Sequence, residues 1–442
     1  MEEDFNKPTT SNHYADNTSL SPNTSGVFSR HTDSVLCCSI DNRTRLAVSG
    51  GIDDTAYVWD LNTTHVIFEC VDHKESVVAA AFSANSTYVA TGDLNGYIQV
   101  RNTTTGIKVF EYEIDEINWI IWHSSSDFVL IAGTTKGDIW MWNVNDPSAV
   151  KTFSSYGSSC TTARLLPDGM KMAVAYADGS LRVFDLKSKQ PVSKLSEPGN
   201  SEIITIDINP KKSVLAIGCL NSSIKLLTLE YLRPIGQLFC KTPAEFKSSY
   251  NPEDAVEPMD QGIGQQDDAV DESDDKDNST ESQGASSEDI EVVDEYSKVA
   301  GEPDKEGEGE TSQNVEEDDE DDVCSSNDEE VDHSESVETV RFSPCGEYLA
   351  AANNSGTIVF WDVSSLAVRC EKHTSIGISR AAWTNNGLYI TGCLDGRIRV
   401  YDINLKEVRV IAAHTDQVLD LALKDGLIVS ASEDKTCRVS RL

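Results

Sequence analysis

The sequence predicts an all-β fold, a β-propeller of eight blades, and three observations carry this prediction. A unit of about 40 residues recurs eight times, and a fixed period of this size is typical of repeat architectures. Within each unit, short apolar segments alternate with turns that contain Gly, Asn or Asp, as in β-strands joined by tight turns. Helical periodicity is absent from these segments.

Each repeat contains a strand that ends in an aromatic residue or its equivalent. The end positions follow one another at intervals of 42, 41, 42, 43, 134, 40 and 39 residues. Four short strands per unit form a propeller blade, because each twisted sheet buries both faces against its neighbours. The long interval holds an insertion of about 92 residues beyond a normal repeat. The end positions are Trp59, Arg101, Trp142, Phe184, Leu227, Trp361, Tyr401 and Ser440.

The insertion carries most of the net charge of the chain. The formal charge is −38 at pH 7, and residues 251–332 contain 33 Asp and Glu against three Lys. A segment this acidic, with few aromatic residues, cannot bury enough apolar surface to fold, so we expect disorder. The predicted divisions are a disordered N-terminus at 1–24, a closing strand with blades 1 to 5 at 25–240, a disordered acidic insertion at 241–333 between blades 5 and 6, and blades 6 to 8 at 334–442.

The last repeat ends before it can form an outer strand. Its third strand finishes near Arg441, and an exposed propeller edge would leave backbone groups unpaired. The segment SGVFSR at residues 25–30 is predicted to supply the missing strand and close the ring. Deleting residues 1–30 should therefore unfold the ring, whereas deleting 1–20 should not.

These repeats resemble the WD-repeat (WD40) family. The resemblance covers residues 25–442 apart from the insertion. It implies a buried hydrogen-bonded set of His, Ser or Thr, Asp and Trp in a blade, because a buried carboxylate must be paired. Repeats 3, 4 and 5 lack the histidine, so we expect apolar packing to hold them. The matching residues are His31, Ser49, Asp53 and Trp59 in repeat 1, His373, Thr391, Asp395 and Tyr401 in repeat 7, and His414, Ser430 and Asp434 in repeat 8.

The sequence indicates a binding scaffold and not an enzyme. Histidines and aspartates recur in register, whereas a catalytic constellation would be unique within the ring. The sequence has no phosphate-binding glycine loop, no serine-hydrolase elbow and no zinc-ligand spacing among its eleven cysteines, so no catalytic residue, cofactor or metal is expected. No apolar run is long enough to span a membrane, and the negative charge disfavours direct binding of nucleic acid. A monomer in the cytoplasm is expected, with entry to the nucleus left open.

Acidic residues recur just before the innermost strands. One interpretation is a negative rim that attracts a Lys- and Arg-rich client. The alternative is that Asp and Glu are simply common at this place in ordinary repeats. The residues are Asp33, Glu75, Glu202, Glu335 and Asp416.

One position of the innermost strand is small in most repeats. Trp119, Arg380 and Asp420 break this rule, and aromatic and Arg side chains dominate binding hot spots. They either bind a partner or fill an irregular channel. The other residues at this position are Cys37, Ala79, Thr162, Thr205 and Thr339.

The insertion itself has two interpretations, a solvated tether or a mobile polyanion that shields a basic client. Ser286, Ser325 and Ser326 each have an acidic residue three positions later, which fits acid-directed kinases. Such spacings are also frequent by chance.

Several stretches are similar to the angio-associated migratory cell protein family. Examples are AVSGGIDDTAYVWDL and LPDGMKMAVAYADGSLRVFDL. That family in turn resembles a yeast ribosome-assembly propeller, so the resemblance implies an escort for a large-subunit ribosomal protein. The alternatives are a signalling adaptor in cell migration with small-GTPase partners, and a histone-binding protein. The acidic run is internal here, whereas the vertebrate members carry theirs near the N-terminus, so properties of that N-terminal region, heparin binding included, do not transfer.

Overall fold

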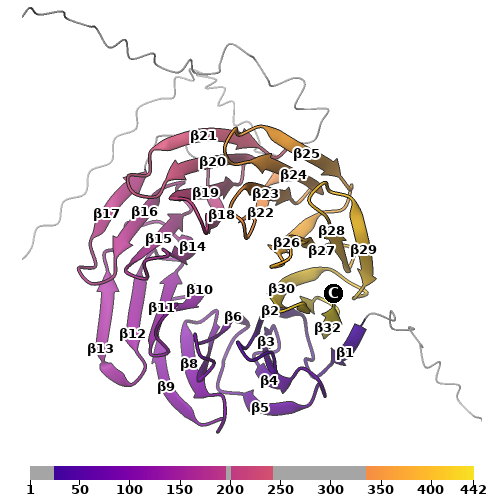
Figure 1. Cartoon of the computed structure of the whole chain (residues 1–442). Coiled ribbons are helices and arrows are strands. Elements are labelled where there is room, and N and C mark those ends of the chain that lie inside the picture. The colour runs from indigo at the N-terminus through magenta and orange to yellow at the C-terminus, as the bar shows by residue number, and fades with distance from the viewer. Residues whose placement is uncertain (1–23, 196–200, 242–334) are drawn as a thin grey trace, which may run out of the picture. The chain divides into compact units, whose positions relative to one another are not determined.

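The computed structural model describes residues 24–195, 201–241 and 335–442, and these form a ring of eight blades around one axis (Figure 1). Each blade is a four-stranded antiparallel sheet. The fold class predicted from the repeats is confirmed. Within the described residues, no helix has the length and apolar character needed to cross a membrane.

The strands are given from the innermost outward. Blade 1 consists of β2 (Val35–Ile40), β3 (Leu46–Gly51), β4 (Ala56–Asp60) and β5 (Val66–Cys70), and blade 2 of β6 (Val77–Phe82), β7 (Tyr88–Asp93), β8 (Tyr97–Asn102) and β9 (Lys108–Glu113). Blade 3 consists of β10 (Ile117–Trp122), β11 (Val129–Thr134), β12 (Ile139–Asn143) and β13 (Asp146–Phe153), and blade 4 of β14 (Cys160–Leu165), β15 (Lys171–Tyr176), β16 (Leu181–Asp185) and β17 (Pro191–Leu195). Blade 5 consists of β18 (Ile203–Ile208), β19 (Val214–Cys219), β20 (Ser223–Thr228) and β21 (Pro234–Phe239), and blade 6 of β22 (Val337–Phe342), β23 (Tyr348–Asn353), β24 (Thr357–Asp362) and β25 (Val368–His373). Blade 7 consists of β26 (Ile378–Trp383), β27 (Tyr389–Cys393), β28 (Arg397–Tyr401) and β29 (Glu407–Ala412), and blade 8 of β30 (Val418–Lys424), β31 (Leu427–Ser432), β32 (Cys437–Arg441) and β1 (Thr24–Phe28).

The core of the ring lies between blades. Each of the eight boundaries between neighbouring blades in the described chain contains its own cluster of buried apolar side chains. At the boundary of blades 4 and 5, for example, Leu181 and Val183 pack with Ile203 and Ile217. A single blade would leave both faces of its sheet in water, so the blades stabilise one another only as a closed set.

The innermost strands share one irregularity. Each of the eight carries a β-bulge directly after its first residue, as between Val35 and Cys37 in β2. A bulge increases the local twist of a strand and turns its side chains relative to the rest of the sheet. It therefore helps to set which side chains of these strands face the axis of the ring.

The ring closes as the chain ends predict. Strand β1 pairs antiparallel with β32, with Val27 opposite Arg438 and Phe28 opposite Cys437. Phe28 is only 1% exposed and stacks on Trp59 of blade 1 with ring centroids 4.7 Å apart. The N-terminal strand thus completes blade 8 and also packs against blade 1.

Some sequence predictions fall outside the described residues. These are the disorder expected for 1–24 and 241–333, and the candidate phosphorylation sites Ser286, Ser325 and Ser326. They stay predictions, as do the exact division points between the segments.

Candidate functional site

The two ends of the ring differ in the loops that they carry. Because neighbouring strands of a blade are antiparallel, the loop that leads into an innermost strand lies at the same end as the turn between the second and third strands. We call this end the entry face. The opposite end, with the turns between the first and second strands, is the exit face.

The structure places the five predicted rim carboxylates on the entry face. Glu75 and Asp416 are exposed and Asp33 is half-buried. The carboxylates of Asp33, Glu75 and Asp416 each accept a hydrogen bond from the backbone N–H of the following residue, at 2.8, 3.1 and 2.8 Å. Glu202 is half-buried, and Glu335 is only 9% exposed. Glu75 and Asp416 are thus the most accessible of the five, and Glu335 is the least accessible.

Further acidic residues gather on the entry face of blades 1 to 3. Burial, together with the nearby charges of Glu75 and Asp53, raises the pKa of Asp54. A hollow of about 380 Å³ lies beside Glu75, and its lining combines carboxylates with apolar side chains. Such a lining suits a Lys or Arg side chain, whose apolar stem and charged head need different surroundings. The lining residues are Glu75, Leu94, Asn95, Ile114, Asp115 and Glu116.

Lysines partly neutralise this face. Lys136 Nζ lies 2.6 Å from a carboxylate oxygen of Asp115, and Lys435 Nζ lies 3.7 Å from Asp33. Exposed ion pairs of this kind contribute little stability, so a cationic client can replace them. Within the described chain, Glu75 and Asp416 lie within 4.0 Å of no Lys or Arg nitrogen.

Of the three unusual innermost-strand residues, the structure brings two together. Arg380 Nε lies 3.5 Å from Asp420 Oδ1, across the boundary of blades 7 and 8, with side-chain exposures of 48% and 23%. Asp420 Oδ2 also accepts a hydrogen bond from the Cys38 backbone N–H at 2.9 Å. Both side chains therefore have structural partners while remaining in contact with solvent.

Trp119, the third of these residues, lies in the core of the ring. Its indole is buried between blades 3 and 4, where Nε1–H donates to the Cys160 carbonyl at 3.0 Å. The ring covers Gly133, where an added Cβ would lie 2.3 Å from the indole. Trp119 fills space that the small residues of β11 leave open, so it belongs to the core.

The hydrogen-bonded set of blade 1 forms a directed chain. Trp59 Nε1–H donates to Ser49 Oγ at 3.2 Å, and the Ser49 hydroxyl lies 2.9 Å from His31 Nε2. His31 Nδ1 lies 3.0 Å from Asp53 Oδ1. An indole can only donate and a carboxylate can only accept, so the Ser49 hydroxyl donates to His31, and His31 donates to Asp53. Although burial alone would raise it, the hydrogen bond from His31 lowers the pKa of Asp53.

Blade 8 repeats this arrangement without an aromatic residue. His414 lies 2.7 Å from Ser430 Oγ through Nε2 and 3.0 Å from Asp434 through Nδ1. Burial lowers the pKa of His414, with Asp434 opposing that shift. The hydrogen bond from His414 outweighs burial and lowers the pKa of Asp434.

The set predicted for blade 7 does not form. Asp395 receives two hydrogen bonds from Arg399, at 2.9 and 2.7 Å, and His373 is exposed and contacts Thr357 of blade 6. The reason is a shift in spacing. His31 and His414 each stand four residues before their innermost strand, but His373 stands five before Ile378, so Thr374 takes the histidine position. Thr391 Oγ1 contacts Cys393 Sγ at 3.4 Å, and Tyr401 is buried.

Blade 2 contains a set that the sequence reading missed. His73 lies 2.8 Å from Thr91 Oγ1 and 3.2 Å from Asp93 Oδ2. The signal was present, since His73 stands four residues before Val77, the same spacing as His31 to Val35. The set was not predicted because Arg101 stands at the position that Trp59 occupies in repeat 1.

In blade 4, a contact between a cation and aromatic rings adds to the apolar packing that the missing histidine predicts. Tyr156 stands four residues before Cys160, in the histidine position, and its ring centroid lies 3.7 Å from the guanidinium carbon of Arg182. Tyr176 contacts the same guanidinium at 4.8 Å. A cation held between two aromatic rings takes the place of the histidine set.

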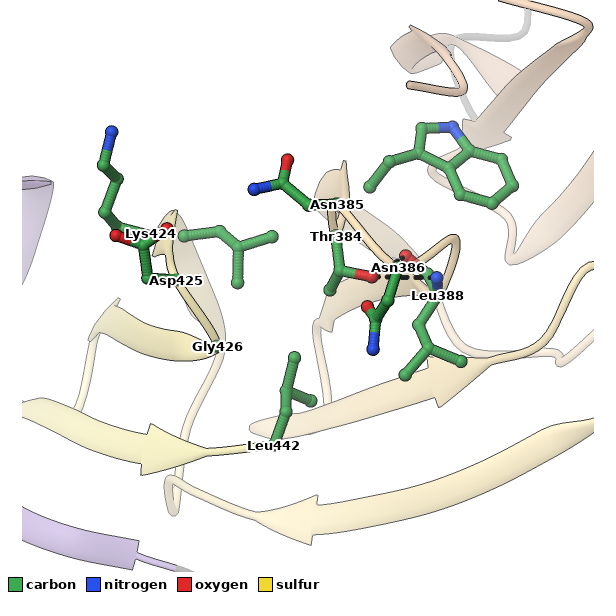
Figure 2. A pocket seen from close by; sticks show the side chains of 10 residues that line it. Thr384, Asn385, Asn386, Leu388, Lys424, Asp425, Gly426 and Leu442 are labelled. Carbon is green, nitrogen blue, oxygen red and sulfur yellow. Dashed lines mark hydrogen bonds between the residues drawn. The ribbon is translucent and has the colours of Figure 1, made fainter. Parts of the chain in front are cut away.

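The exit face carries a hollow of about 510 Å³ between blades 7 and 8 (Figure 2). Its lining combines the apolar side chains of Trp383 and Leu442 with the polar residues Asn385, Asn386, Lys424 and Asp425. A search of the described residues finds no group of His, Cys, Asp and Glu able to hold a metal ion.

Comparison with known proteins identifies the family. The family model for the WD domain, G-beta repeat (WD40) matches residues 22–60, 65–102, 329–362, 364–402 and 405–439. The angio-associated migratory cell protein of Canis lupus familiaris is 30% identical over 420 residues, which cover 93% of this chain and 78% of the dog protein. The chain belongs to the angio-associated migratory cell protein family.

This member of the angio-associated migratory cell protein family also shares its fold with solved propellers. The crystal structure of Saccharomyces cerevisiae Sqt1 superposes with a TM-score of 0.69 at 15% identity, covering 95% of this chain and 99% of Sqt1. That of Chaetomium thermophilum Sqt1 bound to the N-terminus of the ribosomal protein L10 gives 0.67 at 19% identity, covering 95% and 100%. The WD40 model matches blades 1, 2, 6, 7 and 8, and it passes over blades 3 to 5, where the predicted histidine is missing.

Proposed function

We propose that this protein is a non-catalytic escort whose entry face holds a Lys- and Arg-rich segment of a client, with a large-subunit ribosomal protein as the favoured client. The observation that carries the proposal is the gathering of like charges on blades 1 to 3. Glu75 and Glu116 line a hollow together with the apolar side chains of Leu94 and Ile114, and burial, followed by the charge of Glu75, raises the pKa of Asp54. Like charges held close together repel one another, and a bound cation relieves that repulsion.

The comparisons support the choice of client. A fungal Sqt1 of the same fold has been solved with the N-terminus of ribosomal protein L10 bound to it. A 134-residue stretch of this chain is 25% identical to the Saccharomyces cerevisiae ribosome assembly protein SQT1. We therefore propose capture in the cytoplasm, where a new ribosomal protein needs protection of its basic segments.

The test is a binding titration with a fluorescent peptide that carries the L10 N-terminus. The triple variant E75K, E116K and D416K should weaken binding by at least about tenfold at moderate salt, because three attractions become repulsions. Glu335 is left unchanged since it is buried and its backbone carbonyl accepts a hydrogen bond from Ser222 at 2.8 Å.

The matched control changes the same amount of charge on the exit face. The variant D168K, E347K and D425K alters three exposed residues of the turns between first and second strands. It should stay within about threefold of the unchanged protein, since only long-range attraction is affected. If both triple variants lose the same affinity for the L10 peptide, the entry face is not a specific binding site. If a histone-tail peptide binds more strongly than the L10 peptide, the client belongs to the histone class.

A signalling role in cell migration is the second candidate, and the similarity to angio-associated migratory cell proteins favours it. It predicts that affinity capture from cells recovers small-GTPase pathway proteins and that the entry-face triple variant leaves this capture unchanged. Recovery of a ribosomal protein that the same variant abolishes would support the escort instead.

A further inference from the structure

Three arginines lie on the innermost strands, apart from the acidic entry face. Arg164 is the fifth residue of β14, Arg341 is the fifth of β22, and Arg380 is the third of β26. These strands surround the axis of the ring in blades 4, 6 and 7 (Figure 1). Arg164 and Arg341 are half-buried and Arg380 is exposed, so water reaches all three.

Each guanidinium curls back onto its own strand. The Nη1 atoms of Arg164, Arg341 and Arg380 donate to the carbonyl of the preceding residue at 3.3, 2.8 and 2.9 Å. Arg341 Nη1 also lies 3.4 Å from Thr205 Oγ1 of blade 5. A guanidinium has five N–H donors, so most donors of Arg164 and Arg341 stay available to a further acceptor.

The charges around these arginines are incompletely paired. Arg380 has Asp420, but in the described chain Arg164 and Arg341 lie within 4.0 Å of no carboxylate oxygen. Asp207 of β18 lies on the strand between them, and its Oδ2 accepts the Phe342 backbone N–H at 2.7 Å.

Arg164 and Arg341 therefore repel each other across blade 5. Burial, followed by the charge of Arg341, lowers the pKa of Arg164 to about 10, and Asp207 opposes the shift. Arg164 keeps its charge at neutral pH because this value is well above 7. The charged side chains near Arg164 are Arg341, Arg380 and Asp207, and Asp420 lies beside Arg380.

We propose that the inner wall of blades 4 to 6 binds a small oxyanion of the phosphate type through the guanidinium groups of Arg164 and Arg341. The planar forks of two arginines match the oxygens of such an anion, and charge-assisted hydrogen bonds are the strong ones. Thr205, whose hydroxyl already meets Arg341, lies between them as a further polar contact. The ligand is either free phosphate or the phosphate of a phosphorylated side chain.

The test is calorimetric titration of the full chain at low ionic strength with inorganic phosphate and, separately, with a short phosphoserine peptide. R164Q and R341Q should each weaken phosphate binding about tenfold or more, since each removes one charged fork. D207N should tighten it, because the variant removes a negative charge and leaves an oxygen to accept the Phe342 N–H. R369Q, on the outer strand β25, is the matched control and should change nothing.

The outcomes separate cleanly. Tighter binding of the phosphoserine peptide than of inorganic phosphate assigns the site to a side-chain phosphate, and the reverse assigns it to the free anion; both support the oxyanion site. No saturable binding at millimolar phosphate, or losses in R164Q and R341Q that the R369Q control matches, would overturn it. A melting curve shows whether each glutamine variant is folded. If one is not, R164K and R341K, which keep the positive charge, and D207N, which removes a negative charge, still show whether charge controls phosphate affinity.

Discussion

At the scale of single residues, the ring depends on buried polar side chains that hold one another in blades 1, 2 and 8. His31, His73 and His414 each join a hydroxyl to a carboxylate, so the second strand is tied to the loop that enters the blade. The low dielectric of the interior makes such bonds strong, and it makes an unpaired member costly. Blade 7 ties Asp395 to Arg399 within β28 and its preceding turn instead.

This difference predicts unequal costs at matching positions. S430A in blade 8 leaves the buried His414 Nε2 without its donor and should cost about 1 to 3 kcal/mol of stability. T391V, at the equivalent position of blade 7, loses only a contact with Cys393 and should cost less than about 1 kcal/mol. Denaturant unfolding of the two variants checks this, and equal costs would mean that the histidine bond contributes nothing.

Protonation of His414 predicts a dependence on pH. Burial lowers its pKa in the folded protein below the 6.5 of an unfolded chain. Between these two values the unfolded chain binds more protons, so stability falls as pH falls below 6.5. The lowered pKa of Asp434 acts only below its ordinary value of 3.8, outside this window. The melting temperature should therefore drop between pH 7.5 and 5.5, and H414Q should reduce that drop.

The control for this measurement is H65Q, at an exposed histidine. It should keep the full drop of the unchanged protein, because the side chain of His65 is already in contact with solvent in the folded protein. A drop that H414Q and H65Q leave equally large would show that His414 does not titrate as described.

At the scale of elements, β1 decides whether the ring is closed. It supplies the fourth strand of blade 8 and places Phe28 against Trp59 of blade 1. One short strand thus pairs with the backbone groups at the edge of β32 and fills the boundary between the first and last blades. Removing it exposes backbone groups and an apolar surface together.

Two changes test this strand. F28A should cost about 3 to 5 kcal/mol, whereas F128A, at a ring that is 42% exposed, should stay within about 0.5 kcal/mol of the unchanged protein. Deleting residues 1–30 should lower the melting temperature sharply, and deleting 1–20, which removes no described residue, should not. The same melting temperature for both truncations would mean that β1 does not close the ring.

Elements could be predicted from this sequence more fully than side-chain contacts. Every blade must bury both faces in the same way, so the same apolar spacing recurs and marks all eight. A contact depends on direction as well as position. One extra residue turned His373 away from Thr391, and Trp119 folds over Gly133 instead of facing the axis. The pairing of Asp395 with Arg399 depends on local geometry that no family pattern encodes.

At the scale of the whole molecule, charge and fold are separated along the chain. The described residues contain 35 Asp and Glu and 31 Lys and Arg, so the ring is close to neutral. The remaining excess of acidic residues belongs mainly to 251–332. The acidic entry face is therefore a local feature of a nearly neutral ring, and the proposed attraction for a basic client predicts binding without the charge of the insertion.

The separation predicts that the ring survives removal of the acidic run. Where the chain leaves blade 5 and returns to blade 6, Ser222 joins both ends: its carbonyl accepts the Cys240 N–H at 3.0 Å, and its hydroxyl donates to the Glu335 carbonyl at 2.8 Å. Replacing residues 251–329 by a short Gly/Ser linker should leave the melting temperature within about 2 °C, because loop-closure entropy changes slowly with loop length.

The same variant tells whether the acidic run contributes to binding. If the entry face is sufficient, affinity for the basic peptide at moderate salt should stay within about threefold, since distant exposed charges are largely screened. A neutral linker of the full original length separates the effect of charge from that of length. If both linker variants lose binding while their melting temperatures stay unchanged, the main contact of the client is with the acidic run and not with the entry face.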